Sequence, residues 1–548
     1  MASKSGLRWA FLHGGIGVSM IVFLVGRSLA SEQHEHASLG EVDFPISCAA
    51  PVQQKFNRAM ALLHHMTYPQ AREAFEQIVG VAPDCAMAHW GVAMTLFQPL
   101  WPTRPSPAAL VRGWDEVQKA KALKPPSERE RLFIDAATAF FAQPESSDYW
   151  LRIRRWEDAS RKAYAALPGD TEAALFYALA HLATTPANSS TRVHADESAE
   201  ILLDVYKRHP DHPGAMHYLV HANDVPGRER ELLDVTRRYD AIAPDNPHAL
   251  HMPTHIYTRL GDWDAVIKGN VRAADAALLH PAGERGELVW DEFAHAIEYL
   301  VYAYLQQGAD AEALAQLQRL HGTERMEPTF KTAFHLASTR ARYALERRAW
   351  SEAAQIVPRS PSYLDWDRYP WAEAAARFAR GLGAAHLGKQ DEVQSALTRL
   401  AELEGAARKT GEDLFSRNIQ VLSLELTAWL AQVQGQYARS IQVMREAAAL
   451  EAATPKHAVT PGPTLPAFEL LGDLYMEQEN PADALAAYQN SLKMYPRRFN
   501  SLLGAAQAAR GLADTANARR FYEELLEVAA HGSRQVPIKE AQLYLSKP

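Results

Sequence analysis

Apolar residues recur every three to four positions along almost all of the chain after residue 42, and no stretch alternates apolar and polar residues over many positions. The first pattern is typical of amphipathic helices, whereas the second would indicate strands. Ala, Leu, Glu, Arg and Gln, which favour helices or tolerate them well, dominate these segments. The pattern therefore predicts an all-α protein.

The helical pattern repeats with a period of 34 residues near the C-terminus. Positions 8, 11, 20, 24, 27 and 32 of one unit are Gly472, Tyr475, Ala484, Tyr488, Ser491 and Pro496, and the next unit has Ala506, Ala509, Ala518 and Tyr522 at its positions 8, 11, 20 and 24. This spacing resembles the tetratricopeptide repeat (TPR) family, whose unit is a helix-turn-helix. The resemblance implies an α-α superhelical solenoid of degenerate TPR-like repeats, with a concave groove lined by the first helix of each unit.

Carrying the repeat register along the chain predicts its organisation. Pro210 and Pro244, which are 34 residues apart, each end a unit. We expect N-terminal helical hairpins with irregular insertions over 46–210, central TPR-like repeats over 211–456, a linker at 457–467 rich in proline, and a C-terminal TPR pair over 468–535. Residues 31–45 are expected to form a flexible lead-in.

The first thirty residues have the composition of an export signal. Lys4 and Arg8 precede an apolar run, and Ser28-Leu29-Ala30 forms a small-x-small cleavage site. We predict a signal peptide over 1–30 and a periplasmic or secreted mature protein, with an uncleaved membrane anchor as the alternative. No later segment approaches the 18 apolar residues typical of a transmembrane helix, so no stable membrane span is expected in the mature chain.

Composition narrows the possible functions. The net charge of −8 and the absence of a basic run with interleaved aromatic residues argue against nucleic-acid binding. HEXXH, GxSxG, GxxxxGK[ST] and a GxGxxG placed after a strand are absent, so the sequence does not support metalloprotease, serine hydrolase, P-loop or Rossmann chemistry. The two cysteines, Cys48 and Cys85, either pair in an oxidising compartment or remain as two buried thiols.

Histidines concentrate in one part of the chain, with eight of the 22 falling between residues 212 and 298. Two HxxxH pairs, His217/His221 and His251/His255, are offset by one repeat length of 34 residues. Residues four apart on a helix have Cβ atoms about 5–6 Å apart, so two imidazoles can reach one ion. We therefore predict His217, His221, His251 and His255 as ligands of a divalent transition metal, Zn, Cu or Fe. The alternatives are a groove that binds an acidic or peptide ligand through histidine hydrogen bonds, and histidines packed in a narrow interior with ordinary structural bonds.

The repeat register places further polar residues on the same surface. These are His248, His335, Tyr302 and Arg342, predicted to line a ligand-binding groove, and Asp224, His295 and Glu298, which are candidates for orienting the ligands or for acid/base catalysis. His64 and His65 are expected at a polar helix end, and His89 and His181 are expected to be structural.

Two functions from different classes fit these features. One is an exported TPR-like scaffold whose groove binds a protein or peptide partner, or a metal, through its histidines. The alternative is a metal-dependent enzyme with histidine ligands from adjacent repeats. TPR-like repeats mostly mediate interactions, which favours the scaffold, but a fold does not determine a function.

Overall fold

The structure is a computed structural model that describes residues 38–101, 103–187, 191–283 and 286–546. The predicted signal peptide and the first part of the lead-in therefore lie outside the described residues. The described chain is helical from end to end, and its extended contacts are two isolated β-bridges, Ala282 with Leu288 and Val289 with Met326. The all-α solenoid of TPR-like hairpins is confirmed.

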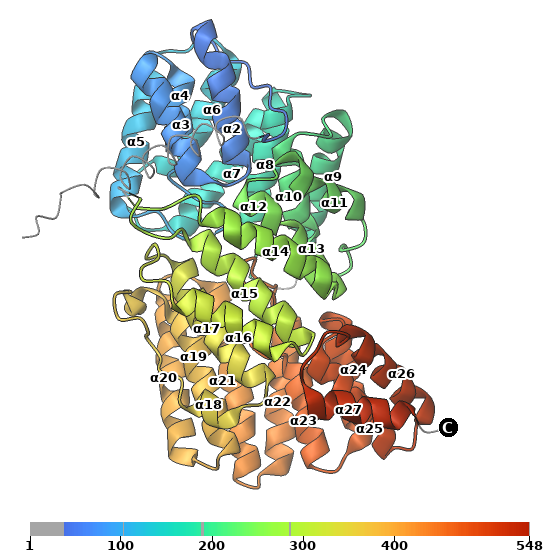
Figure 1. The fold of residues 1–548 in the computed structure, drawn as a ribbon. Coiled ribbons are helices and arrows are strands. Elements are labelled where there is room, and N and C mark those ends of the chain that lie inside the picture. The colour runs from blue at the N-terminus through green and yellow to red at the C-terminus, as the bar shows by residue number, and fades with distance from the viewer. Residues whose placement is uncertain (1–37, 102, 188–190, 284–285, 547–548) are drawn as a thin grey trace, which may run out of the picture.

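The N-terminal half is a set of helical hairpins that closes on itself (Figure 1). After a short 3-10 helix (Ala50–Val52) come α2 (Gln53–His64), α3 (Tyr68–Val81), α4 (Ala86–Met94), α5 (Pro107–Ala122), α6 (Glu128–Phe141), α7 (Tyr149–Ala166), α8 (Thr171–Ala183), α9 (Thr191–Arg208), α10 (Pro213–Asn223) and α11 (Leu233–Ile242). Helix α2 contacts α4, α4 contacts α6, α7 joins α6 to α8, and α10 contacts both α8 and α2. One hydrophobic core fills this half.

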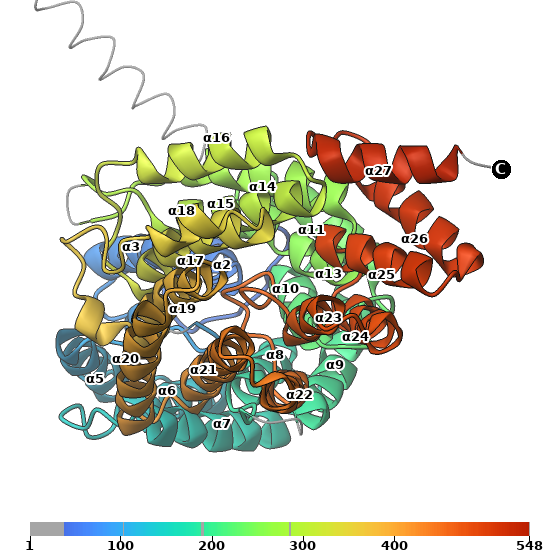
Figure 2. The same ribbon diagram turned by 90° about the horizontal axis from the view of Figure 1, so that it is seen from below.

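The C-terminal half closes in the same way. After α12 (Pro247–His251), α13 (Pro253–Leu260) and α14 (Trp263–Ala277) come α15 (Asp291–Gln306), α16 (Asp310–His321), α17 (Phe330–Glu346), α18 (Trp350–Ala354), a 3-10 helix (Trp366–Arg368), α19 (Pro370–His386), α20 (Gln390–Lys409), α21 (Asp413–Val433), α22 (Tyr437–Ala452), α23 (Ala467–Glu477), α24 (Pro481–Met494), α25 (Phe499–Gly511), α26 (Thr515–Val528) and α27 (Gln535–Leu545). The odd-numbered helices from α15 to α25 each contact the next, and α25 contacts α15. Figure 2 shows these hairpins arranged around a closed curve.

The predicted TPR register is visible in the packing of the C-terminal unit. A Cβ atom on Gly472 would lie 2.6 Å from the ring of Tyr488, and one on Gly504 would lie 2.4 Å from it. Real side chains do not approach so closely, so glycine at both positions lets the Tyr488 ring pack between α23 and α25. The spacing of small and aromatic residues thus has the structural role that the repeat pattern predicts.

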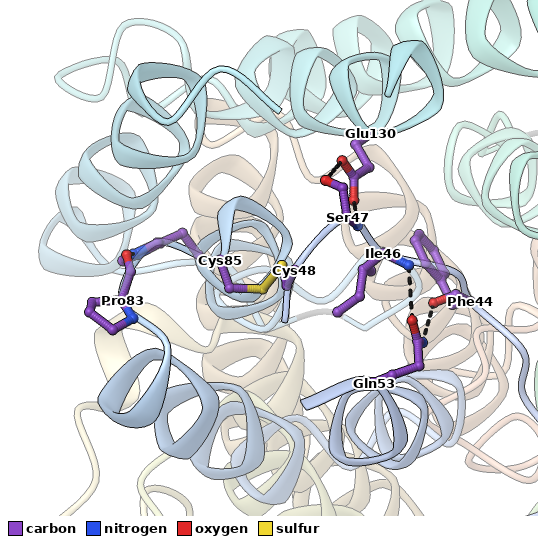
Figure 3. The surroundings of a disulfide bond; sticks show 9 residues. Phe44, Ile46, Ser47, Cys48, Gln53, Pro83, Cys85 and Glu130 are labelled. Carbon is purple, nitrogen blue, oxygen red and sulfur yellow. Dashed lines mark hydrogen bonds between the residues drawn. A yellow bond between two sulfur atoms is a disulfide. The ribbon is translucent and has the colours of Figure 1, made fainter. Parts of the chain in front are cut away.

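The two cysteines form a disulfide, which resolves the alternatives that the sequence left open. Cys48 lies in the segment before α2, and Cys85 is the residue that precedes α4. Figure 3 shows the bond beside the hydrogen bonds that hold this segment, including Gln53 Nε2 to the carbonyl of Phe44 at 2.8 Å. The disulfide therefore fixes the first described residues to the N-terminal core.

The segment predicted as a linker at 457–467 is irregular, but it is not an exposed connection. Val459 and Leu465 are fully buried, and Thr460 is 5% exposed. Its prolines prevent a regular helix, because they lack the backbone N–H group. The stretch 453–466, hereafter the inner loop, runs from α22 to α23 through the interior and carries polar contacts to the predicted site. No helix among the described residues is long and apolar enough to cross a membrane.

Candidate metal centre

Five neighbouring helices carry the predicted site residues. His217 and His221 lie on α10, His248 and His251 on α12, and His255 on α13; helix α15 carries His295, Glu298 and Tyr302, and α17 carries His335 and Arg342. Helix α10 contacts α13, α12 contacts α15, and α15 contacts α17. The repeat register therefore placed these residues correctly on adjacent helices.

The residues at the N-termini of these helices favour helix initiation. Proline occupies the first helical position of α10, α12 and α13, where its missing N–H is not needed. The side chain of Asn246 accepts a hydrogen bond from Ala249 N at 3.0 Å and caps α12. Pro253 divides the predicted single helix into α12 and α13, yet His251 and His255 remain on the same side, with ring centroids 4.8 Å apart.

The four predicted metal ligands fall into two groups of three rather than one group of four. His217 and His221 join His248, whereas His251 and His255 join His295, and within each group one ligand atom per residue lies within 4.8 Å of the others. The Nε2 atoms of His217 and His248 are 3.1 Å apart, as are those of His217 and His221. The Nε2 atoms of His251 and His255 are 2.9 Å apart.

Fixed acceptors determine the protonation of the first group. His217 donates from Nδ1 to the carbonyl of His64 at 2.6 Å, and His248 donates from Nδ1 to the carboxylate of Glu292 at 3.2 Å. A neutral imidazole carries one proton, so a proton at Nδ1 leaves a lone pair at Nε2. The Nε2 lone pairs of His217 and His248 therefore point at each other.

The second group has the same arrangement. His251 donates from Nδ1 to Asn270 Oδ1 at 2.6 Å, and Asn270 is oriented by its own Nδ2, which donates to the carbonyl of Val266 at 2.9 Å. His255 donates from Nδ1 to Asp224 Oδ2 at 2.8 Å. The Nε2 atoms of His251 and His255 are again left as two facing lone pairs.

Two facing lone pairs require a proton or a cation between them. Burial, followed by the charges of neighbouring histidines, lowers the pKa of His217 and of His251 well below 6.5. Burial also lowers the pKa of His255 to about 4, although its hydrogen bond to Asp224 raises it. A second proton on His217, His251 or His255 is thus disfavoured at neutral pH. Metal–nitrogen bonds of 2.0–2.1 Å at a tetrahedral angle place two nitrogens about 3.3 Å apart, which is within a few tenths of an ångström of the observed separations.

A chain of hydrogen bonds sets the protonation of His295. Glu298 accepts from Nδ1 of His335, and Nε2 of His335 then accepts from Nδ1 of His295 at 3.1 Å. The Nε2 atom of His295 is buried and has no hydrogen-bond partner in the described ranges of the chain. Glu298 thus acts on the cluster through His335, and the chain leaves a free lone pair on His295.

Each carboxylate around the histidines is paired with a cation. Asp224 binds Arg259 Nε at 2.5 Å and Lys456 Nζ at 2.8 Å, and Glu298 binds Arg342 Nε at 2.9 Å. Burial raises the pKa of Asp224, but the charges of Lys456 and Arg259 outweigh it, and the net pKa lies well below 3.8. In Glu298 burial is likewise outweighed, by His335 and Arg342, and the pKa is lowered. The two carboxylates among the three candidate acid/base residues are therefore held ionised.

The predicted groove is a buried interior and not an open surface. His217, His248, His255, His295 and His335 are all 0% exposed, and His251 is 1% exposed. Trp101, from the segment between α4 and α5, packs its ring 5.2 Å from His248 and 5.6 Å from His295. On another side Tyr299 packs 4.7 Å from His251 and contacts carbonyls of the inner loop. Sequence reasoning missed these covering residues, because they come from distant segments.

Tyr302 and Arg342 have other partners than the predicted ligand. The hydroxyl of Tyr302 accepts from Arg498 at 2.9 Å, within a buried network that includes Glu346 and Glu469. Arg342 donates to Pro463 O at 2.6 Å and to Thr460 Oγ1 at 2.8 Å. Arg342 thus ties the inner loop to Glu298, and Tyr302 belongs to the connection with the C-terminal hairpins.

A third histidine group lies behind α10. Glu172 accepts from His64 Nε2 at 2.9 Å and from His212 Nε2 at 3.2 Å. His64 Nδ1 contacts the hydroxyl of Tyr218 at 3.0 Å, and His212 Nδ1 accepts from Gly214 N at 3.2 Å. His64 and His65 lie at the end of α2 as expected, but they do not face solvent: both are 0% exposed, and His65 bonds the hydroxyl of Tyr239 and the carbonyl of Leu39. His89 and His181 are structural as expected, bonded to Glu116 and Glu157.

The fold and these contacts define an all-α protein of TPR-like hairpins with a buried histidine cluster. No protein-family model and no curated protein matches the sequence. Among solved structures, a chain of the APC/C hetero-tetramer Cut9-Hcn1 is similar at 13% identity over 97% of this chain and 94% of that one, with a TM-score of 0.31. A tetratricopeptide repeat protein from Parabacteroides merdae ATCC 43184 is similar at 15% identity over 55% of this chain and 98% of that one, with a TM-score of 0.29. At these scores any function has to be argued from the residues of this chain.

Proposed function

We propose that the protein is an exported TPR-like scaffold that binds transition-metal ions in its buried histidine cluster. The observation that carries this proposal is the pair of facing Nε2 atoms in each group, His217/His248 and His251/His255, with the Nδ1 protons of these four histidines already assigned to protein acceptors. Metal-bound histidines characteristically donate their other ring N–H in this way. Two adjacent sites are expected, one at His217, His221 and His248 and the other at His251, His255 and His295.

Burial favours an ion over a peptide as the ligand of these histidines. A peptide needs exposed side chains to contact, and the cluster histidines other than His221 are at most 1% exposed. A protein partner would instead bind elsewhere on the helical surface, as TPR-like arrays generally do. The donor set consists of imidazoles, which suits Zn, Cu or Fe better than Mg or Ca.

Binding without turnover is the function that these contacts support best. Asp224 and Glu298, the candidate acid/base residues, are held in ion pairs that lower the pKa of each. His295 presents a free lone pair to its group, as a ligand does. We therefore propose metal binding in place of the metal-dependent enzyme.

Export is the second part of the proposal. The predicted signal peptide and the disulfide between Cys48 and Cys85 both support it, since disulfides persist mainly in oxidising compartments. Fractionation of cells that produce the full chain tests this part, with recovery of mature protein beginning near Ser31 as the expected result.

Metal analysis of protein purified without a polyhistidine tag tests the binding. Wild-type protein, as purified or after dialysis against Zn, Cu or Fe salts, should retain close to two equivalents of one of these metals. The His217→Ala/His251→Ala variant should retain none. A folded wild type that keeps no stoichiometric metal after all three dialyses would overturn the proposal.

A further inference from the structure

A polar cavity lies on the side of the inner loop that faces away from the histidine cluster. Its volume is about 50 Å³, and its walls come from α21, the end of α22, Tyr495 and the inner loop. A water molecule needs roughly 10–15 Å³ of such space, so the cavity accommodates a hydrated ion with few water molecules. Half-buried Asn418, Thr454 and Thr464 line its rim and connect it to the exterior.

Two buried carboxyl groups in this cavity lack the partners that buried acids normally have. Glu425 is 0% exposed, and neither of its carboxyl oxygens has a hydrogen-bond partner among the residues that the structure describes. Glu451 is 7% exposed; one oxygen accepts from Ala467 N at 3.2 Å, the other has no hydrogen-bond partner within the described part of the chain, and the nearby Tyr495 hydroxyl acts to lower its pKa. Burial, and then the charge of Glu451, raises the pKa of Glu425, and burial raises the pKa of Glu451 to about 8. Unlike Asp224 and Glu298, neither acid forms an ion pair with a lysine or arginine among the described residues, although the charge of Arg498 lowers the pKa of Glu451 in part.

The cations that line the same cavity are already bound to carboxylates on the histidine side. Lys456 donates to Asp224 at 2.8 Å, and Arg342 donates to Glu298 at 2.9 Å. Both cationic groups are therefore engaged on the histidine side, although Lys456 shares Asp224 with Arg259. The carboxyl oxygens of Glu425 and Glu451 remain the unpaired acceptors of the cavity.

The inner loop is a partition between this cavity and the histidines. Lys456, Thr460 and Gly462 line the cavity, while the Thr460 carbonyl lies 3.4 Å from the hydroxyl of Tyr299 on the other side. The ring of Tyr299 packs 5.2 Å from that of His255 and 5.4 Å from that of His295. One layer of loop backbone and one aromatic ring thus separate the two polar compartments.

We infer that this cavity is a cation-entry site, in which Glu425 and Glu451 bind a metal ion before it passes the inner loop to the histidine cluster. The inference rests on the proposed metal binding and adds a route to it. The ion exchanges water ligands for carboxylate oxygens, and the carboxyl protons are released to water. A buried cluster needs such a route, because its own ligands are closed to solvent.

The rate of Co(II) uptake tests this route, since Co(II) bound by imidazoles absorbs visible light. Stopped-flow mixing of metal-free protein with Co(II) should show uptake slowed about tenfold or more in Glu425→Gln/Glu451→Gln, because the local concentration of the cation is lost. The final absorbance and the equilibrium affinity should equal those of the wild type. Glu446→Gln, an exposed position on α22, is the matched control and should leave the rate unchanged. Uptake by the double variant at the wild-type rate would overturn the entry site.

A second measurement separates this inference from the proposed function. In the His217→Ala/His251→Ala variant, Mn(II) followed by its EPR signal should still bind, with a dissociation constant of about 10⁻⁴–10⁻³ M, as in weak oxygen-ligand sites. Adding Glu425→Gln and Glu451→Gln should abolish that binding. If Mn(II) binding is absent or survives the glutamine substitutions, the carboxyl pair is not a cation site, whether or not the histidines hold metal.

Discussion

Two kinds of histidine arrangement are separated only by α10: the His64–Glu172–His212 triad, and the facing pairs His217/His248 and His251/His255. They are equally buried, yet the hydrogen-bonding atoms of their side chains are satisfied in different ways. In the triad, one carboxylate accepts from two imidazoles, and each remaining ring nitrogen has a hydroxyl or an N–H partner. In the facing pairs, every Nδ1 has an acceptor but the Nε2 atoms meet each other.

This difference shows that proximity of histidines does not by itself define a metal site. All three groups bring their ligand atoms within 4.8 Å, so distance alone does not separate them. Assigning each proton does separate them, because the triad is complete without an ion and the facing pairs are not. The following predictions test that distinction.

The largest effect is expected on metal content. His217→Ala and His251→Ala should each remove about one equivalent, because each removes a central ligand from a different group. His212→Asn, which keeps a side-chain acceptor for Gly214 N but changes the triad, should leave the metal content at the wild-type value. Atomic emission analysis of the three folded variants checks this. Loss of metal from His212→Asn would mean that the triad also binds metal, and the proposed difference between the triad and the facing pairs would be wrong.

A smaller effect is expected from the residue that orients His251. Asn270→Ala removes the acceptor of the His251 Nδ1 proton and should weaken metal affinity about 10- to 100-fold, as changes to such supporting residues usually do. Competition with a chromophoric chelator measures the affinity. Asn223→Ala is the matched control, since Asn223 is also a buried asparagine bonded to a helix carbonyl but contacts Arg228 rather than an imidazole.

A substitution in the triad should change the free energy of unfolding and leave the metal content unchanged. Glu172→Gln replaces one of two acceptor oxygens with an NH₂ group that faces an imidazole N–H, and the buried unpaired donors should cost about 1–3 kcal/mol. Urea titration measures the loss. The equivalents of bound metal should not change, and a variant of unchanged stability would mean that the triad is not a closed hydrogen-bond network.

The smallest effect concerns a histidine that belongs to neither arrangement. His386 lies between Trp350, with ring centroids 3.7 Å apart, and Trp429, at 4.1 Å. Burial, and then the charge of Arg348, lowers the pKa of His386 from 6.5 to about 3. Below pH 6.5 the unfolded chain therefore binds a proton at His386 more readily than the folded chain does. The contribution of His386 to the free energy of unfolding is fully present above pH 6.5 and is lost as the pH falls toward about 3.

Replacing this ring isolates its contribution. In His386→Phe the loss of stability between pH 6.5 and about 3 should be less steep than in the wild type, because one buried titrating group is gone. Urea midpoints at several pH values measure the slope, and His531→Phe, at an exposed position, should leave it unchanged. An unaltered slope in His386→Phe would contradict the assignment.

The sequence was sufficient to predict the helical repeats and to identify most of the residues in the histidine cluster. The 34-residue offset between the HxxxH pairs put His217, His221, His251 and His255 on adjacent helices, and the Trp350 turn placed His335 near Glu298. These are local features, because repeat register and helical spacing follow from a short stretch of chain.

What escaped prediction depends on contacts between distant segments. Trp101, Asn270 and the inner loop cover or orient the histidines from positions that the repeat register does not relate to them. The inner loop was predicted as a linker because its prolines and Gly462 are typical of one; its buried Val459 and Leu465 show that a stretch poor in helix formers can still belong to a core. The triad was missed because His64 and Glu172 are 108 residues apart.

Anomalous diffraction from crystals of the untagged protein, soaked in Zn or Cu salts and measured at the metal's absorption edge, tests the central claim most directly. The proton assignments predict two peaks, one bridging the Nε2 atoms of His217 and His248 and one bridging those of His251 and His255, each at about 2.0–2.1 Å from nitrogen. No peak is predicted at His64, Glu172 and His212. Peaks at the triad alone, or at neither facing pair after soaking, would contradict the account.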